Sequence, residues 1–129
     1  MKFKYDLSLP LSEWDNLVDY VDEIVRGRYG GQVISWGHLG DCNIHLNIVI
    51  DNDSVGNEDY SSDDVAMFID PVVYDYVIEK GGSISAEHGI GVSKKKYVEI
   101  SKGGVVFGLM KKIKIVFDPK NIMNPGSLF

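Results

Sequence analysis

Four short stretches of the chain are predicted to be β-strands, and in three of them apolar and polar residues alternate, a pattern typical of half-buried strands. The stretches are residues 2–7, 32–36, 44–50 and 83–87, of which residues 32–36 do not alternate. In the third, every second residue is apolar, while His45 and Asn47 lie on the other side. In the fourth, Ile84 and Ala86 are expected to face the core and Glu87 the solvent. Each of the three alternating strands therefore has one core face and one polar face.

Four other stretches carry apolar residues at the spacing of an α-helix. They are residues 12–27, 63–80, 94–100 and 105–116. The second is expected to bury a stripe made of Val65, Phe68, Ile69, Val72, Val73, Tyr76 and Val77. Ser12 begins the first helix, with acidic residues in its first turn. Pro71 lies within the second helix and is expected to kink it or to split it in two. Asp118-Pro119 ends the last helix.

The strands and helices follow the order βαββαβ, with further helices at the C-terminal end. This order predicts an α+β, ferredoxin-like split-βαβ domain with an antiparallel sheet. With 129 residues, 44% of them hydrophobic, the chain fits one domain over residues 1–129. Residues 51–64 are expected to form an acidic loop. It resembles a calcium-binding loop but has Ser62 in place of the closing glutamate, so we do not expect calcium there.

Charge is unevenly distributed along the chain. The formal net charge is −6, with 16 acidic and 4 basic residues in 1–79 but 3 acidic and 9 basic in 80–129. The acidic total argues against nucleic-acid binding. The basic part is interpreted as solvated helix surface or as a contact for an anionic ligand. A single cysteine fits a reducing compartment, and neither a membrane span nor a targeting segment is expected.

All three histidines lie in residues 37–47 and 83–91. The turn-forming residues 40–43 are expected to fold His38 back towards His45 over one face of a hairpin. Together with Glu87 they offer two nitrogens and one oxygen, donors that suit Zn, Mn or Fe(II), with zinc the first choice. Three protein ligands leave an open position, as in catalytic sites. The competing interpretation is that the two histidines are hydrogen-bonded within an ordinary hairpin and bind no metal.

Three further residues are candidates for a role in the same site. His88 is a candidate general base, because imidazole titrates near neutrality, or else it orients a metal ligand. Glu87 and His88 can share a site only if the backbone departs from a regular strand, which Gly89 permits. Asn47 is expected either to hydrogen-bond a substrate carboxylate or to hydrogen-bond polar groups of the hairpin. Lys4 is expected either to pair with an anionic substrate or to be solvated.

Several well-known motifs are missing from the sequence. It has no G-x-G-x-x-G or G-x-x-x-x-G-K-[ST] nucleotide-binding pattern. No serine or cysteine stands in a recognisable nucleophile context. Cys42 lacks an obvious activating neighbour and is interpreted as a turn residue.

Three motifs occur in an order that is typical of one enzyme family. They are GHLGD-x-N-x-HLN at residues 37–47, S-x-SAEHG-x-G at 83–91 and FDPKNI-x-NPG at 117–126. With the opening KYDLSLP at 4–10, they closely resemble the C-terminal part of FAD-linked 2-hydroxyacid dehydrogenases of the vanillyl-alcohol-oxidase type. D-2-hydroxyglutarate dehydrogenases are the nearest group, followed by D-lactate and glycolate dehydrogenases. The resemblance covers nearly the whole chain.

This resemblance implies a metal-assisted oxidation of a D-2-hydroxy acid to the 2-oxo acid. It implies that His38, His45 and Glu87 are metal ligands and that His88 is the catalytic base. In such enzymes the metal binds oxygens of the substrate, the base takes the hydroxyl proton, and the α-hydrogen leaves as hydride to FAD.

The resemblance also implies that Lys4 and Asn47 hold the substrate and that Asn124 lies near the flavin. The flavin-binding domain of such enzymes lies upstream of these residues. The isolated chain is therefore expected to be colourless and inactive, with that domain and an electron-acceptor protein as partners. A mitochondrial location is implied, with the cytoplasm as the alternative. Some relatives carry an actin-interacting label, which these residues neither support nor exclude.

Two residues depart from the family pattern. Cys42 stands where the family usually has glycine, and a left-handed backbone at that turn would cost about 1–2 kcal/mol. Ser127 replaces a common lysine. The alternative to an enzyme segment is a non-catalytic interaction module or metal-binding fragment. A less favoured third reading is a metal-dependent lyase or isomerase that uses the same three ligands.

Overall fold

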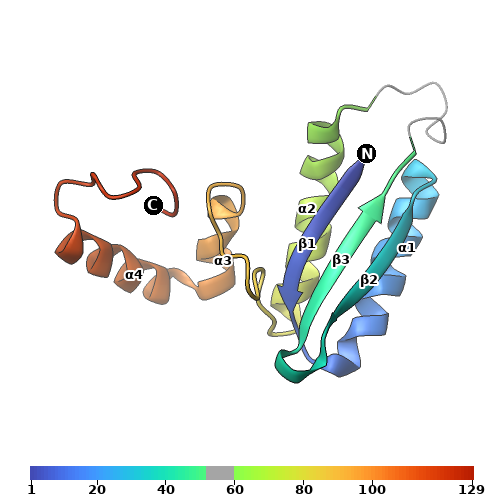
Figure 1. Cartoon of the computed structure of the whole chain (residues 1–129), viewed down its shortest axis with the longest axis horizontal. Helices are drawn as coiled ribbons and strands as arrows, with labels where there is room; N and C mark the ends of the chain where they lie inside the picture. Colours follow the sequence, from blue (N-terminus) through green and yellow to red (C-terminus); the bar gives the residue numbers. More distant parts are fainter. Residues whose placement is uncertain (52–59) are drawn as a thin grey trace. The chain divides into compact units, whose positions relative to one another are not determined.

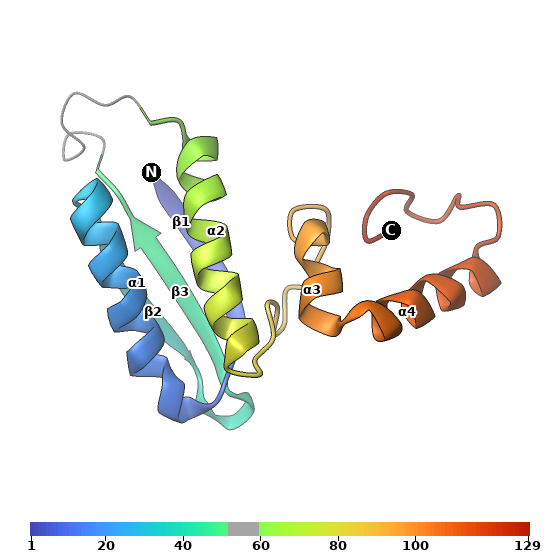
Figure 2. The ribbon, with the colours of Figure 1, turned by 180° about the vertical axis from the view of Figure 1, so that it is seen from behind.

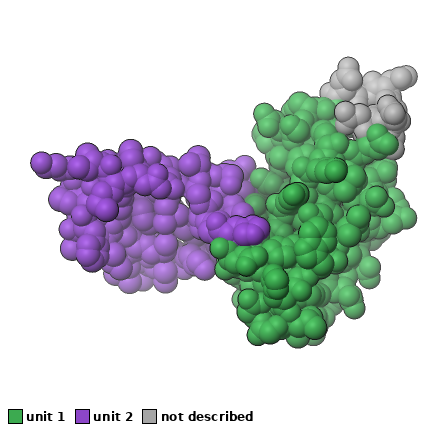
Figure 3. Space-filling model, viewed as in Figure 1, with its two compact units in different colours: residues 1–87 green, residues 88–129 purple. Residues whose placement is uncertain are grey.

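The computed structural model describes residues 1–51 and 60–129 (Figure 1). Residues 52–59, the middle of the loop expected at 51–64, lie outside the described residues. The prediction that this loop does not bind calcium falls on the same residues. The chain forms two compact units, residues 1–87 and residues 88–129 (Figure 3). The candidate histidines of the hairpin and Glu87 belong to the first unit, whereas His88 opens the second.

The described part of the first unit contains one antiparallel sheet of three strands. The strands are β1 (Lys2–Ser8), β2 (Gln32–His38) and β3 (Asn43–Val49), in the order β1-β3-β2. The register places Asp6 and Trp36 on either side of His45, and Lys4 and Ile34 on either side of Asn47. Because side chains alternate along a strand, these polar residues share one face of the sheet. The predicted α+β fold with an antiparallel sheet is confirmed.

Two helices, α1 (Trp14–Tyr29) and α2 (Ser62–Glu79), cover the other face of the sheet (Figure 2). Their buried stripes meet the apolar side of the strands in one core. Its central members are Tyr5, Leu7, Leu17, Val21, Val25, Ile44, Leu46, Ile48, Val65, Ile69, Val73 and Val77. Burying each such large side chain contributes about 1.5–3 kcal/mol. The helices therefore pack against the apolar face of the sheet, and the opposite face carries the polar side chains.

The stretch predicted as a fourth strand differs from expectation. It pairs with the sheet only through a single bridge between Ser8 and Ser83. Ile84 is fully buried as predicted, but Ala86 is exposed, so its expected core position is wrong. The physical reason is that the backbone N–H of Ala86 donates to the Asp6 carboxylate, at 2.9 Å, instead of to a neighbouring strand.

The helix α2 runs unbroken through Pro71, so that of the two effects expected of this proline, a kink or a split, the split does not occur. Its buried stripe also differs at two aromatic positions. Phe68, predicted to be buried, is 36% exposed, whereas Tyr74 is 4% exposed and packs edge-on against Tyr5 with ring centroids 5.6 Å apart. The ring of Phe68 instead lies under the Arg28 guanidinium, 4.3 Å from its centroid. The aromatic residues of α2 are thus shared between the core and the surface.

The second unit is helical. It contains the 3₁₀ turn η4 (Lys95–Tyr97), α3 (Val98–Lys102) and α4 (Gly104–Phe117), while the first unit adds the 3₁₀ turns η1 (Leu11–Glu13) and η2 (Leu39–Asp41). The predicted helices at 94–100 and 105–116 are therefore confirmed. No residue of α4 is buried, although most are apolar. None of the helices in the described residues combines the length and apolarity needed to cross a membrane.

A capping box begins α2. The Ser61 hydroxyl accepts from the backbone N–H of Asp64 at 3.1 Å, and the Asp64 carboxylate accepts from the backbone N–H of Ser61 at 3.2 Å. The hydrogen bond from the Ser61 hydroxyl, followed by that from its backbone, holds the pKa of Asp64 below its ordinary value of 3.8. The ionised carboxylate therefore stabilises the fold above that pH, and the contribution is lost as the pH falls through the lowered pKa.

We predict that Asp64→Asn is less stable than the unaltered chain at neutral pH, and that the two converge in acid. Urea unfolding over a pH series measures the difference. Asp63→Asn, which removes a first-turn charge outside the capping box, is the control and should show the weaker pH dependence. Parallel stability curves for Asp64→Asn and the unaltered chain would contradict the role of the capping carboxylate.

Candidate metal centre

The uncovered face of the sheet gathers the residues that the sequence singled out in the first unit. β3 contributes His45 and Asn47, β2 contributes His38, and β1 contributes Lys4. Glu87 comes from the irregular segment after the bridge at Ser83. Residues far apart in the sequence therefore meet on one surface.

Two imidazoles and one carboxylate converge there. The Nε2 atom of His45 lies 3.2 Å from Glu87 Oε1, and the Nε2 atom of His38 lies 3.9 Å from the same oxygen. The two imidazole rings stand edge to face, with centroids 5.4 Å apart. Ligands about 2.0–2.1 Å from a tetrahedral zinc ion lie about 3.4 Å from one another. The donor types and the spacing of His45 and Glu87 thus suit a divalent metal, while His38 lies farther from Glu87 than two ligands of one zinc ion would.

Exposure differs among the three donors. The side chain of His45 is 14% exposed, whereas those of Glu87 and His38 are 49% and 61% exposed. The His45 side chain is thus mostly buried, whereas the side chains of Glu87 and His38 are accessible to solvent. Ligand-capable atoms of His45, Glu87 and also Asp6 lie within 4.8 Å of one another, whereas His38 is not part of this group. The arrangement leaves an accessible side from which a substrate can approach.

A tight turn brings His38 to His45. η2 joins β2 to β3, and His38 pairs with Asn43 at the ends of these strands. A side chain at Gly37 would overlap the Asn43 backbone carbonyl, so glycine permits the close approach of the two strands. Cys42 closes the turn with φ 58° and ψ 28°, the left-handed conformation. The turn expected from residues 40–43 is therefore present.

Because Cys42 has a Cβ, its left-handed backbone costs about 1–2 kcal/mol, of which glycine's greater entropy loss on folding offsets about 0.5–1. We predict that Cys42→Gly raises the free energy of unfolding by roughly 0.5–1 kcal/mol. Gly40→Ala is the matched control in the same turn, because its φ is not positive and its Cβ would meet open space. Urea unfolding compares the two. A loss of stability in Cys42→Gly would contradict strain at this position.

Asp6 is a site residue that the sequence did not single out. Its Oδ2 accepts hydrogen bonds from the Ser85 hydroxyl at 3.1 Å, the Ala86 N–H at 2.9 Å and the Glu87 N–H at 3.0 Å. Its Oδ1 lies 3.9 Å from Nδ1 of His45. The signal available in the sequence was its place on the polar side of the first strand, two residues after Lys4.

The two candidate substrate residues are neighbours across the sheet. Lys4 pairs in register with Asn47, and the Lys4 side chain is exposed. Asn47 is 9% exposed, and its amide donates to the backbone carbonyl of His45 at 3.3 Å. The structure thus brings a cation and an amide to the same face as the three donors.

The other two predicted site residues belong to the second unit. His88 is exposed and precedes Gly89, whose φ is 80°. Asn124 is exposed and has φ 50°. The Asp118 carboxylate, which receives the Lys114 ammonium at 2.6 Å, also accepts the backbone N–H groups of Ile122 and Met123. These contacts lower the pKa of Asp118, with the Lys114 hydrogen bond contributing most, and they fix the segment leading to Asn124.

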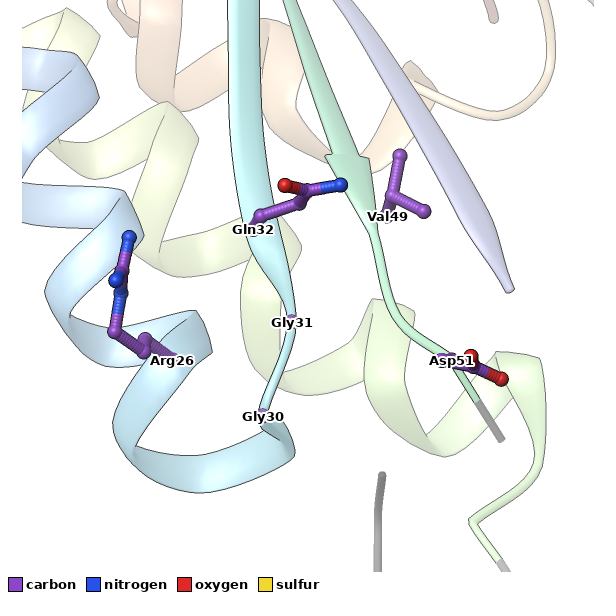
Figure 4. A pocket seen from close by; sticks show the side chains of 6 residues that line it. All are labelled: Arg26, Gly30, Gly31, Gln32, Val49 and Asp51. Atoms are coloured by element: carbon purple, nitrogen blue, oxygen red, sulfur yellow. The ribbon is translucent and has the colours of Figure 1, made fainter. Parts of the chain in front are cut away.

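A polar cavity of about 430 Å³ opens at the other end of the strands (Figure 4). Its lining comprises Arg26, Gly30, Gly31, Gln32, Val49 and Asp51. Gln32 and Val49 pair at the end of the sheet opposite His38 and Asn43, so this cavity is separate from the candidate metal centre. The guanidinium of Arg26 already pairs with Asp22 at 2.6 Å. None of the residues singled out from the sequence lines this cavity.

Comparison with known proteins agrees with the motifs. A probable mitochondrial D-2-hydroxyglutarate dehydrogenase of Oryza sativa subsp. japonica is 43% identical over 95% of this chain, which covers 20% of that protein. The D-2-hydroxyglutarate dehydrogenase of Stutzerimonas stutzeri is 37% identical over 98% of the chain and 27% of its own length. A D-2-hydroxyglutarate–pyruvate transhydrogenase of Saccharomyces cerevisiae is also 37% identical, over 95% of the chain.

The chain spans about a fifth to a quarter of the length of these relatives. Residues 1–128 match the family model described as the C-terminal domain of FAD-linked oxidases. The resemblance expected from the three sequence motifs is confirmed, and the chain belongs to the FAD-linked oxidase C-terminal domain family.

Proposed function

We propose that this chain is the substrate-side segment of a flavin-dependent oxidoreductase that converts a D-2-hydroxy acid into the 2-oxo acid. The substrate would be of the 2-hydroxyglutarate or lactate type. The observation that carries the proposal is the convergence of His38, His45 and Glu87 on one accessible face, where the two imidazole Nε2 atoms lie 3.9 and 3.2 Å from Glu87 Oε1. Membership of the FAD-linked oxidase family supports the same reading.

His38 and His45 would hold the metal through Nε2, and Glu87 through Oε1. Zinc is the first choice, because two imidazoles and a carboxylate are donors that it accepts readily. When bound, such an ion supplies a Lewis acid that polarises a substrate oxygen. The partial exposure of His38 and Glu87 leaves the substrate a path to this position.

Lys4 and Asn47 would hold the substrate carboxylate. They face each other across β1 and β3 on the surface that carries the histidines. A lysine ammonium on an exposed strand position can pair with an anion, and the Asn47 amide adds a directional hydrogen bond. Together they would orient the acid so that its hydroxyl carbon is presented to the flavin.

His88 would accept the proton of the substrate hydroxyl. On a regular strand, adjacent side chains point to opposite faces, which would separate His88 from Glu87. Here the segment after Ser83 is irregular, and Gly89 adopts a positive φ, so that constraint does not apply. A neutral imidazole is a suitable proton acceptor at physiological pH.

FAD, held by the remainder of the enzyme, would accept the hydride from the substrate. Asn124 would lie near that flavin, and an electron-acceptor protein would reoxidise it. The apolar surface that α4 exposes, including Leu109 at 53% and Ile113 at 58%, suits a contact with that remainder of the enzyme. Plant and animal relatives named as mitochondrial favour that compartment, with the cytoplasm as the alternative.

The test is to graft this chain onto the flavin-bearing part of the Arabidopsis thaliana relative, which is 43% identical over the matched segment. The chimaera is expected to carry flavin and to reduce an electron acceptor with D-2-hydroxyglutarate or D-lactate. The isolated chain is expected to be colourless and to turn over neither acid. A folded, flavin-loaded chimaera that oxidises no D-2-hydroxy acid would contradict the proposal.

The second candidate is a metal-binding or interaction segment without catalytic activity. The observation that favours it is that His38, His45 and Glu87 all lie within the first unit. In that case the isolated chain would bind zinc, but the chimaera would remain inactive. Turnover of a 2-hydroxy acid by the chain without any electron acceptor would instead indicate a lyase or isomerase.

A further inference from the structure

Asp6 links two of the three candidate metal ligands. It is 4% exposed, which is unusual for a carboxylate, and it lies directly across the sheet from His45. Burying an unpaired carboxylate is costly, so such a group is normally retained only with several hydrogen-bond donors. The donors identified for its Oδ2 are the Ser85 hydroxyl and the backbone N–H groups of Ala86 and Glu87.

The two oxygens of Asp6 face different parts of the centre. Oδ2 fixes the backbone at Glu87, the residue whose Oε1 meets His45 Nε2 at 3.2 Å. Oδ1 lies 3.9 Å from Nδ1 on the other side of the same imidazole ring. That distance is longer than a hydrogen bond, but a carboxylate there still favours a proton on Nδ1.

We propose that Asp6 is the positioning residue of the metal centre. Its charge holds the His45 proton on Nδ1 and so leaves the Nε2 lone pair for the ion, while its second oxygen anchors the segment that presents Glu87. Carboxylates that orient a metal-bound histidine in this way are a recurring feature of metal sites. This inference rests on the metal site of the proposed function and assigns to β1 a role in building it.

Asp6→Asn separates the two contributions of Asp6. The amide oxygen can still accept the backbone N–H groups of Ala86 and Glu87, so the segment remains anchored. The amide NH₂ group then takes the place of Oδ1 and directs its own protons at Nδ1 of His45. Because that nitrogen must itself carry a proton when Nε2 binds an ion, the substitution disfavours the binding tautomer.

The experiment measures zinc affinity of the 129-residue chain by competition with a chromophoric chelator. Asp6→Asn is expected to weaken binding about 10- to 100-fold, the range found for residues that orient ligands. The control is Asp70→Asn, which removes a carboxylate hydrogen-bonded to Tyr5 on the same strand, at 2.9 Å. It is expected to leave zinc affinity unchanged, so a general loosening of β1 would affect both variants.

The cobalt(II) spectrum of each variant at saturation provides a second measurement. If Asp6 only positions the ligands, the saturated spectrum of Asp6→Asn matches that of the unaltered chain. A changed spectrum would make Asp6 itself a ligand and overturn the proposal, as would an unchanged zinc affinity. If the unaltered chain binds no zinc, the proposed metal site fails together with this inference. Should Asp6→Asn not fold, Asp6→Glu, which keeps the charge, is measured in the same way and is expected to retain more affinity than Asp6→Ala.

Discussion

Replacing Glu87 by glutamine is expected to cause the largest loss of metal binding of any single substitution in the chain. Glu87 Oε1 is the atom on which both imidazoles converge, at 3.2 and 3.9 Å. A neutral amide removes the charge that balances the cation and is a weaker ligand than a carboxylate. We expect zinc affinity to fall by more than about 100-fold, the upper end of the effect expected for a residue that only orients ligands.

The matched control is Glu23→Gln, because Glu23 is an exposed acid of α1 on the helical side of the sheet. It removes the same charge from the chain without touching the centre. Equal zinc affinities for Glu87→Gln and Glu23→Gln would remove Glu87 from the ligand set. A loss in both would indicate that the acidic net charge of the chain attracts the ion non-specifically.

Replacing His88 by alanine in the flavin-bearing chimaera is expected to have the largest effect on turnover. Loss of a positioned general base lowers kcat by about 10²- to 10⁴-fold. Metal content and flavin content should be unchanged, because His88 is assigned to proton transfer and not to binding. Steady-state kinetics with D-2-hydroxyglutarate, together with elemental analysis, measures both.

Full turnover in His88→Ala would exclude it as the base. Loss of the metal in that variant would instead assign His88 to the metal site.

The faces of the sheet could be predicted from the sequence because period two is unambiguous along β1 and β3. The alternation that buries Ile44 and Leu46 necessarily places His45 on the uncovered face of the sheet. The helices were also predictable from spacing, since α1 and α2 each bury one stripe against the sheet. What spacing could not decide was which aromatic residue of α2 enters the core, because Phe68 and Tyr74 are almost equally apolar on their ring faces.

The segment at residues 83–87 shows where the sequence pattern was insufficient. Its alternation is that of a strand, and Ile84 is buried accordingly. Its backbone, however, is held by a side chain from β1, and the contact between Asp6 and the N–H of Glu87 spans 81 positions. Such long-range hydrogen bonds leave no local periodicity. For the same reason, the three donors of the candidate centre could be predicted from the sequence, whereas the Asp6 carboxylate, which contacts two of these residues, could not.

The fold therefore explains how distant donors reach one face. β3 and β2 are joined by a tight turn, which places His38 beside His45, and the single bridge at Ser83 brings Glu87 back to the sheet. Each step uses backbone geometry that the first unit supplies by itself. The centre is accordingly expected to form in the isolated chain, without a flavin.

The most direct test is to crystallise the chain with zinc and to locate the ion by anomalous scattering at the zinc absorption edge. We expect one ion on the uncovered face of the sheet, bound by Nε2 of His38, Nε2 of His45 and Oε1 of Glu87, with the fourth position open to solvent. An anomalous peak elsewhere, or no peak at this face in the presence of saturating zinc, would contradict it.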